Sequence, residues 1–110
     1  MKWKKGKFEI RVKDLTNKIL AMRQSGYISD NGLFGIHRVN DRYAVWVLTH
    51  IPTGLSGFAD MRFNAVKSFA DRLVAADPRG ILPKMTYPLT SYRRRQARAI
   101  WDAALSEVTA

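Results

Sequence analysis

The chain has 110 residues and a formal net charge of +10 at neutral pH, with 19 lysines and arginines against 9 acidic residues. Chains of this length form one domain with a single small core, which excludes a multi-domain enzyme. The lack of cysteine excludes disulfides, thiol nucleophiles and cysteine-based metal sites. Hydrophobic residues make up 46% of the chain, which indicates a folded protein, and no apolar run is long enough to span a bilayer. The excess of positive charge favours an acidic partner.

The first part of the chain predicts a basic strand followed by a helix. Apolar and charged residues alternate over residues 8–12, which is typical of a short strand with one solvated face. Leu15, Ile19 and Met22 then recur at helical spacing, so we expect a helix over residues 15–24. The basic start lacks the uninterrupted apolar run of an export signal, which predicts a cytoplasmic protein.

The middle of the chain predicts a sheet with a helix behind it. Turn-forming residues 29–32 precede a β-hairpin with strands over 33–39 and 43–51, and residues 55–59 favour a third short strand. Asp60 is placed to cap a helix that follows. The apolar stripe of that helix comprises Val66, Phe69, Ala70, Leu73 and Val74.

The end of the chain predicts an extended segment and a last helix. Two prolines interrupt residues 79–90, and Ser91 can cap an amphipathic helix over 91–110. The fold class is therefore expected to be α+β, with a small antiparallel three-stranded sheet packed against helices. The expected parts of this single domain (1–110) are 1–32, the basic strand and helix; 33–78, the sheet-plus-helix core; 79–90, a proline-containing linker; and 91–110, the C-terminal helix.

Positive charge is concentrated in two flanks, because residues 1–20 and 81–100 each carry +5 while residues 21–60 are neutral overall. One flank places four arginines at the start of the last helix, where they oppose the helix dipole. A sequence selected only for helix stability would not place cations there, so this cluster is predicted to hold phosphates. The cluster comprises Arg93, Arg94, Arg95 and Arg98.

The other flank mixes lysines with Trp3 and Phe8, a combination that can neutralise phosphates and stack on an unpaired base. The alternative is a flexible basic start in which Trp3 only anchors the fold. The predicted phosphate contacts in this flank are Lys2, Lys4, Lys5, Lys7, Arg11 and Lys13.

Residues that could support catalysis form no motif. His50 lies near a turn, with Asp41 or Asp60 as conceivable partners, but neither spacing matches a known catalytic or metal-binding pattern. We therefore interpret His50 as structural and Trp46 as a core residue, and we expect no enzyme activity, no metal and no cofactor. A small nuclease is the less favoured reading.

Residues 33–76 resemble the three-strand-plus-helix DNA-binding module of ethylene-response factors and phage integrase arms. The likeness is carried by Gly35-Ile36-His37-Arg38-Val39, the strand from Tyr43 to Leu48, Gly57-Phe58 and the run from Asn64 to Ala70. In that family the open face of the sheet enters the major groove. The resemblance implies Arg38, Arg42 and Trp46 as the counterparts of the family's base and phosphate contacts. The sheet part of the segment, residues 33–60, departs from the family in being neutral overall rather than arginine-rich.

A second likeness leaves another class of function open. Residues 46–54, followed by an alanine-containing helix, are similar to small accessory proteins of phages and other mobile elements. The leading hypothesis is a non-catalytic protein that binds DNA or RNA and contacts no membrane. The alternative is an anti-defence inhibitor, like anti-CRISPR proteins, that binds a host protein or ribonucleoprotein through Tyr87, Tyr92 and Trp101. The amphipathic last helix also allows a homodimer.

Overall fold

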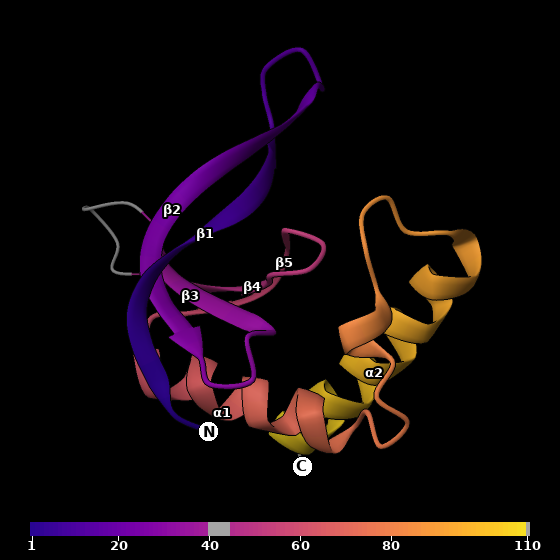
Figure 1. Cartoon of the computed structure of the whole chain (residues 1–110). Coiled ribbons are helices and arrows are strands. Elements are labelled where there is room, and N and C mark those ends of the chain that lie inside the picture. The colour runs from indigo at the N-terminus through magenta and orange to yellow at the C-terminus, as the bar shows by residue number, and fades with distance from the viewer. Residues whose placement is uncertain (40–44, 110) are drawn as a thin grey trace.

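The computed structural model describes residues 1–39 and 45–109, with side chains described up to residue 106. Five strands are followed by two α-helices and a short 3-10 helix between them (Figure 1). In chain order the elements are β1 (Trp3–Lys13), β2 (Ile19–Ser29), β3 (Phe34–Val39), β4 (Val45–His50), β5 (Leu55–Asp60), α1 (Phe63–Ala75), η1 (Leu82–Lys84) and α2 (Ser91–Thr109).

The five strands form one antiparallel sheet in the order β1-β2-β3-β4-β5, so each strand pairs with its neighbour in sequence. The α+β class is correct, but the predicted three-stranded sheet is wrong, because the first 29 residues supply two further long strands. Within the described residues no helix is long and apolar enough to cross a membrane.

The helix predicted over residues 15–24 is wrong, because these residues form a turn and the first part of β2. Strand β2 pairs with β1 along its whole length, from Trp3 opposite Ser29 to Lys13 opposite Ile19. The helical spacing was misleading because its three apolar residues do not share a buried face. Leu15, Ile19 and Met22 are all exposed in the hairpin.

The turn between β1 and β2 is built around Asp14. Its carboxylate accepts hydrogen bonds from the Thr16 hydroxyl at 2.6 Å, the Thr16 N–H at 2.8 Å and the Lys18 N–H at 3.0 Å. The hydroxyl bond and then the two backbone bonds hold the pKa of Asp14 below its ordinary value. Asn17 adopts the left-handed backbone conformation with φ of 64°, which asparagine tolerates better than most residues. Residues 14–18 therefore favour a tight, well-ordered turn over a helical one.

The central hairpin, the third strand and the helix that follows are confirmed as β3, β4, β5 and α1. The predicted hairpin turn at residues 40–42 lies outside the described residues. Asp60 does not cap α1, because the N-cap residue is Arg62. The Asp60 carboxylate instead accepts a hydrogen bond from the Arg62 N–H at 2.7 Å and pairs with the Arg62 guanidinium. In the predicted stripe, Val74 is exposed while the other four residues are buried.

Helix α2 begins at the predicted residue, but the side chain that caps it is Thr90, which accepts the Arg93 N–H at 3.1 Å. The segment before α2 is packed rather than free. The Asp77 carboxylate accepts the N–H groups of Ile81 and Leu82, both at 2.8 Å, which places Leu82 in the core.

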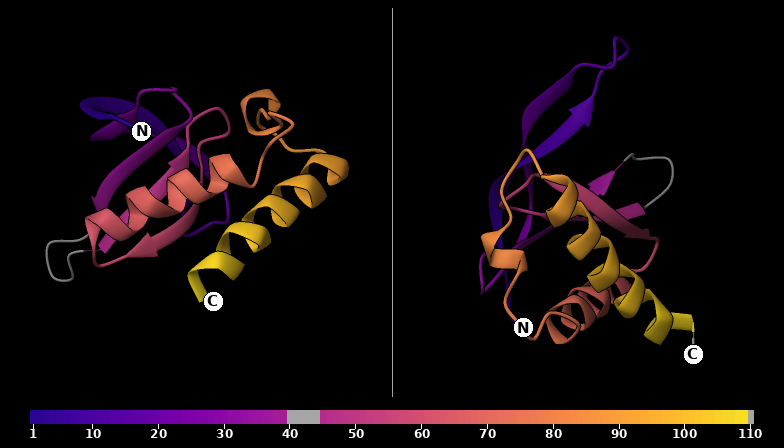
Figure 2. Two further views of the ribbon diagram at one scale, coloured as in Figure 1. Left: turned by 90° about the horizontal axis from the view of Figure 1, so that it is seen from below. Right: turned by 90° about the vertical axis from the view of Figure 1, so that its right-hand side faces the viewer.

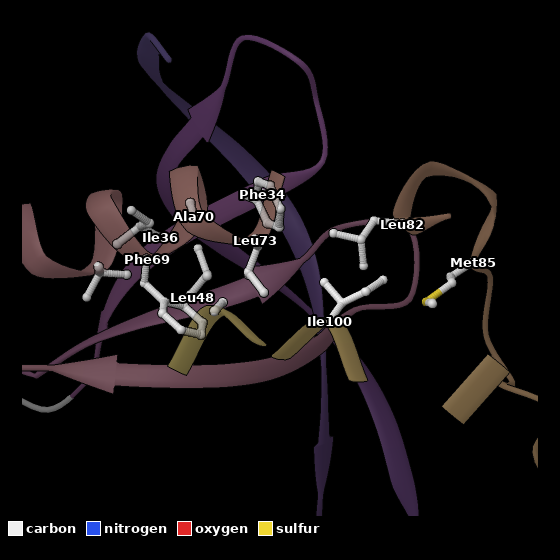
Figure 3. Close-up of a cluster of buried hydrophobic side chains, with 11 residues drawn as sticks. Phe34, Ile36, Leu48, Phe69, Ala70, Leu73, Leu82, Met85 and Ile100 are labelled. Carbon is white, nitrogen blue, oxygen red and sulfur yellow. The ribbon is translucent and has the colours of Figure 1, made fainter. Parts of the chain in front are cut away.

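Both α-helices lie on the same side of the sheet (Figure 2). The core between them and the sheet is shown in Figure 3. On the other side the ring of Phe8 lies over Gly35, where a Cβ atom would be 2.6 Å from that ring. The buried cluster comprises Phe34, Ile36, Leu48, Val66, Phe69, Ala70, Leu73, Leu82, Met85, Ile100 and Ala104.

The sheet curls so that β1 reaches the turn between β4 and β5. The Arg11 N–H donates to the Gly54 carbonyl at 2.7 Å. Gly54 lies in the turn with a φ of 71°, in the left-handed region that glycine adopts readily. Beyond this contact the β1–β2 hairpin extends away from the rest of the molecule (Figure 1 and the right panel of Figure 2).

Candidate nucleic-acid interface

A hollow of about 620 Å³ opens where β2 and β3 separate. The two strands pair only at Tyr27 with Ile36 and Ile28 with Gly35, after which β2 follows β1 into the projecting hairpin. Gly26 makes the close approach possible, because a Cβ atom there would lie 2.2 Å from the Ile36 carbonyl oxygen. The hollow is therefore a consequence of the strand arrangement.

Three cations and two aromatic rings line this hollow. Lys5 and Lys7 come from β1, and Arg38 comes from β3. The register places Tyr27 opposite Lys5 and Trp46 opposite Arg38, so each ring lies beside a cation. The other lining residues in the described ranges 1–39 and 45–109 are Gly6, Gln24, Ser25 and Gly26, so none of these is acidic.

The two rings are held by a third aromatic residue at the start of α1. The centroid of Phe63 lies 5.1 Å from that of Tyr27 and 4.8 Å from that of Trp46, and Tyr27 and Trp46 are 6.4 Å apart. Lys67 places its ammonium 5.4 Å from the Phe63 centroid. Tyr27 and Trp46 are half-buried, so their positions are set by packing while part of each ring faces the hollow.

The cations of the hollow have no acidic counterpart in the described part of the chain. There, the ion pairs are those of the N-terminal amine with Asp71 at 3.8 Å and of Arg62 with Asp60 at 3.2 Å. Lys5, Lys7 and Arg38 are all exposed. Their charge is thus directed to solvent and available to an anionic partner.

The remaining residues of the predicted N-terminal patch are dispersed. Lys2 and Lys4 are exposed near the start of the chain, and Lys13 lies at the far end of β1. Arg11 has partners within the protein, because its Nε donates to the Thr53 carbonyl at 3.0 Å and its guanidinium lies 4.0 Å from the centroid of the Tyr87 ring. Arg42, a further predicted contact, lies outside the described residues.

The arginine cluster of α2 forms a separate surface. Arg94, Arg95 and Arg98 are exposed, and Arg93 donates to the Gln96 side chain at 2.8 Å. The first turn of α2 lies at the opposite end of the molecule from the end of β3 that carries Arg38 (Figure 1). The two charged flanks therefore do not meet in one clamp.

His50 is buried and its ring nitrogens are both engaged. Nδ1 lies 2.9 Å from the Thr53 hydroxyl, and Nε2 lies 2.8 Å from the Leu82 carbonyl. This pattern fits a neutral ring that donates from Nε2 and accepts at Nδ1. Burial lowers the pKa of His50, opposed in part by the Leu82 carbonyl and by Asp77. The adjoining hollow of about 230 Å³, between β5 and α2, is lined mainly by apolar side chains.

Within residues 1–39 and 45–109, no group of three or more potential metal ligands comes together. The aromatic residues of the alternative hypothesis differ in their surroundings. Tyr87 is covered by Arg11, and the Trp101 indole N–H donates to the Gly57 carbonyl at 2.8 Å. Tyr92 is 60% exposed.

Tyr27 was not among the residues predicted for the site. Trp46 was interpreted as a core residue from its apolar strand, whereas the family resemblance implied it as a contact. Trp46 does pack against α1, but it also lines the hollow. Arg38 and Trp46 share the face of the sheet that α1 covers, since Ile36 and Leu48 of the same face are in the core. One signal in the sequence could have pointed to Tyr27. Apolar and charged residues alternate along β1, which predicts a strand, and a strand of that length needs a partner strand, which here is β2.

Comparison of the chain with protein-family models, curated proteins and solved structures finds no match.

Proposed function

We propose that this chain is a non-catalytic nucleic-acid-binding protein whose binding site is the hollow between β2 and β3. The observation that carries the proposal is the convergence of Lys5, Lys7 and Arg38 around two half-buried aromatic rings, with no acidic residue in the lining among the residues that the structure describes. A basic groove with aromatic side chains is the combination by which proteins hold a sugar–phosphate backbone and stack on its bases.

Each part of the site has a separate role in this proposal. Lys5 and Lys7 neutralise phosphates as point charges, whereas the planar guanidinium of Arg38 can donate two parallel hydrogen bonds to one phosphate. Tyr27 and Trp46 offer ring surface to an unstacked base. Phe63 holds both rings, so little conformational entropy is lost when a ligand binds.

The alternative function, inhibition of a host protein or ribonucleoprotein, has less support. It relied on Tyr87, Tyr92 and Trp101 as one exposed aromatic cluster. Two of these side chains are engaged inside the protein, by Arg11 and by Gly57. We therefore treat binding to a protein partner as an outcome of the experiment below.

The proposal is tested with two triple variants that remove the same charge from different surfaces. One replaces Lys5, Lys7 and Arg38 by glutamine, and the other replaces Arg94, Arg95 and Arg98 by glutamine. Each lowers the formal net charge from +10 to +7. All six side chains are exposed, so both variants are expected to fold.

Binding to labelled duplex and single-stranded DNA and to structured RNA is measured across a salt series. Each phosphate contact contributes about 0.9 to the slope of log K against log salt on duplex DNA and about 0.7 on a single strand. The hollow variant is expected to flatten the slope by about 2.7 or about 2.1, respectively. Equal losses in both variants would refute a localised site. Absence of nucleic-acid binding by the wild type would reject the function and favour the protein-binding alternative.

A further inference from the structure

The projecting β1–β2 hairpin ends in an apolar side chain held out in water. Leu15, at the turn, has a relative exposure of 107%, so nothing in the described protein covers it. Ile19, Leu20 and Met22 on β2 are also exposed. An isolated exposed leucine is ordinary, but here Leu15 lies at the turn, Leu20 and Met22 lie on one face of β2 and Ile19 lies on the other. Apolar surface around the whole end of a projecting ribbon favours contact with a partner.

The turn that carries Leu15 is ordered by hydrogen bonds. Besides the three bonds that the Asp14 carboxylate accepts, the Asp14 N–H donates to the Lys18 carbonyl at 2.9 Å, and the Asn17 N–H donates to the Asp14 carbonyl at 3.1 Å. An ordered turn loses little entropy when its tip is inserted into a partner. Leu15 is thus presented in a prearranged position.

The charges around the tip indicate an anionic partner. Lys13, at the end of β1, and Lys18, just before β2, flank Leu15 on the two sides of the turn, and both are exposed. The nearest acidic group, Asp14, is occupied by the turn itself. A second copy of the chain is disfavoured as the partner, because two such tips would bring four lysines together.

The dimensions of the hairpin suit the grooves of duplex DNA. Arg11 is the last residue of β1 whose backbone is bonded to the turn before β5, and Leu15 follows it by four residues. At about 3.3 Å per residue the last two residues of β1 reach about 7 Å beyond Arg11, and the turn that carries Leu15 extends further, whereas the grooves of B-DNA are about 8 Å deep. The deep, narrow major groove of an RNA duplex excludes such a ribbon.

We propose that the β1–β2 hairpin enters a groove of duplex DNA and that Leu15 inserts between neighbouring base pairs as an apolar wedge. Lys13 and Lys18 then contact phosphates on the two walls of the groove. Wedges of this kind partly unstack a base step and kink the duplex by about 20–90°. This inference rests on the proposed function, and it adds the form of the nucleic acid and a change in its shape.

The test compares Leu15→Ser with Met61→Ser. Met61, between β5 and α1, is 73% exposed and offers a matched loss of apolar surface away from the hairpin. The probes are a short DNA duplex containing 2-aminopurine, which becomes brighter when it is unstacked, and the same duplex with a donor and an acceptor dye on its ends. Affinity is measured at the same time by anisotropy, and oligomeric state by size-exclusion chromatography.

The wild type and Met61→Ser are expected to raise 2-aminopurine fluorescence and to shorten the distance between the dyes. Leu15→Ser should lose both signals and bind about tenfold more weakly, a difference of about 1.4 kcal/mol. Binding by the wild type without unstacking or bending, or equal signals from Leu15→Ser, would overturn the wedge while leaving the proposed function intact. A dimer that Leu15→Ser converts to a monomer would also overturn it, in favour of a second copy as the partner.

Failure of the proposed function can be distinguished from failure of the wedge. If the variant lacking Lys5, Lys7 and Arg38 retains the wild-type salt slope while the Leu15 signals persist, the hollow is not the binding site and the hairpin is. If the wild type binds no nucleic acid, both proposals are rejected.

Discussion

Replacing Arg11 by alanine should destabilise the fold and leave nucleic-acid binding nearly unchanged. Arg11 belongs to the basic N-terminal flank, but its guanidinium is used within the protein. Its Nε donates to the Thr53 carbonyl at 3.0 Å, and the group lies 4.0 Å from the centroid of the Tyr87 ring. These contacts join β1 to the turn before β5 and to the segment before α2.

The size of the loss follows from these two contacts. A hydrogen bond from a charged donor contributes about 1.5–3 kcal/mol, and partial exposure of Arg11 reduces this to about 1 kcal/mol. The stacking on Tyr87 adds about 0.5–1 kcal/mol. Arg11→Ala should therefore lose about 2 kcal/mol and about 8 °C in Tm. Arg11→Lys keeps the charge but lacks the Nε donor and the planar group, so it should lose about 1 kcal/mol.

Thermal unfolding followed by circular dichroism measures the stability, and a salt series on duplex DNA measures the binding. The slope of log K against log salt should change by less than about 0.3 in either variant, compared with about 0.9 for the loss of a phosphate contact. An unchanged Tm in Arg11→Ala, together with a slope flattened by about 0.9, would show that Arg11 serves binding rather than structure.

Two further predictions concern stability. Burial lowers the pKa of both His37 and His50 in the folded protein. On acidification the unfolded chain therefore takes up protons before the folded chain does. The free energy of unfolding should be constant above about pH 7.5 and fall below about pH 6.5, by at most about 1.4 kcal/mol per pH unit for each histidine. Urea unfolding between about pH 7.5 and about pH 5.5 checks this, and a flat profile in that window would contradict it. Asp77→Ala removes the acceptor of two backbone N–H groups and should cost about 2 kcal/mol in urea unfolding. Asp102→Ala is the exposed control and should change stability by less than about 0.5 kcal/mol.

The elements that could be predicted from the sequence are those whose own residues show a clear pattern. Strands β3 and β4 are rich in β-branched and aromatic residues, and α1 has a clear apolar stripe. Strand β2 was missed because both of its faces carry apolar residues and because Leu15, Ile19 and Met22 imitate helical spacing. That spacing indicates a helix only if the residues are buried together, and in a projecting hairpin they remain exposed.

The sequence indicated the charges of the site and, through the family resemblance, Trp46, but not how they come together. Lys5, Lys7 and Arg38 were identified from the sequence, but their convergence depends on where β2 leaves β3, which is a tertiary feature. Tyr27 fell just beyond the predicted helix and so had no assigned partner. Its place opposite Lys5 becomes apparent only from the register of β1 and β2.

The most direct test of the central claim is to map binding on the isotopically labelled chain by NMR during titration with a short DNA duplex and with a single strand. With the single strand we expect the largest backbone shifts at Gly26, Tyr27, Arg38 and Trp46, together with the indole N–H of Trp46. With the duplex we expect the same shifts and, in addition, shifts at Lys13, Leu15 and Lys18. Shifts confined to the first turns of α2, around Arg94 and Arg98, would contradict the assignment of the hollow as the nucleic-acid site.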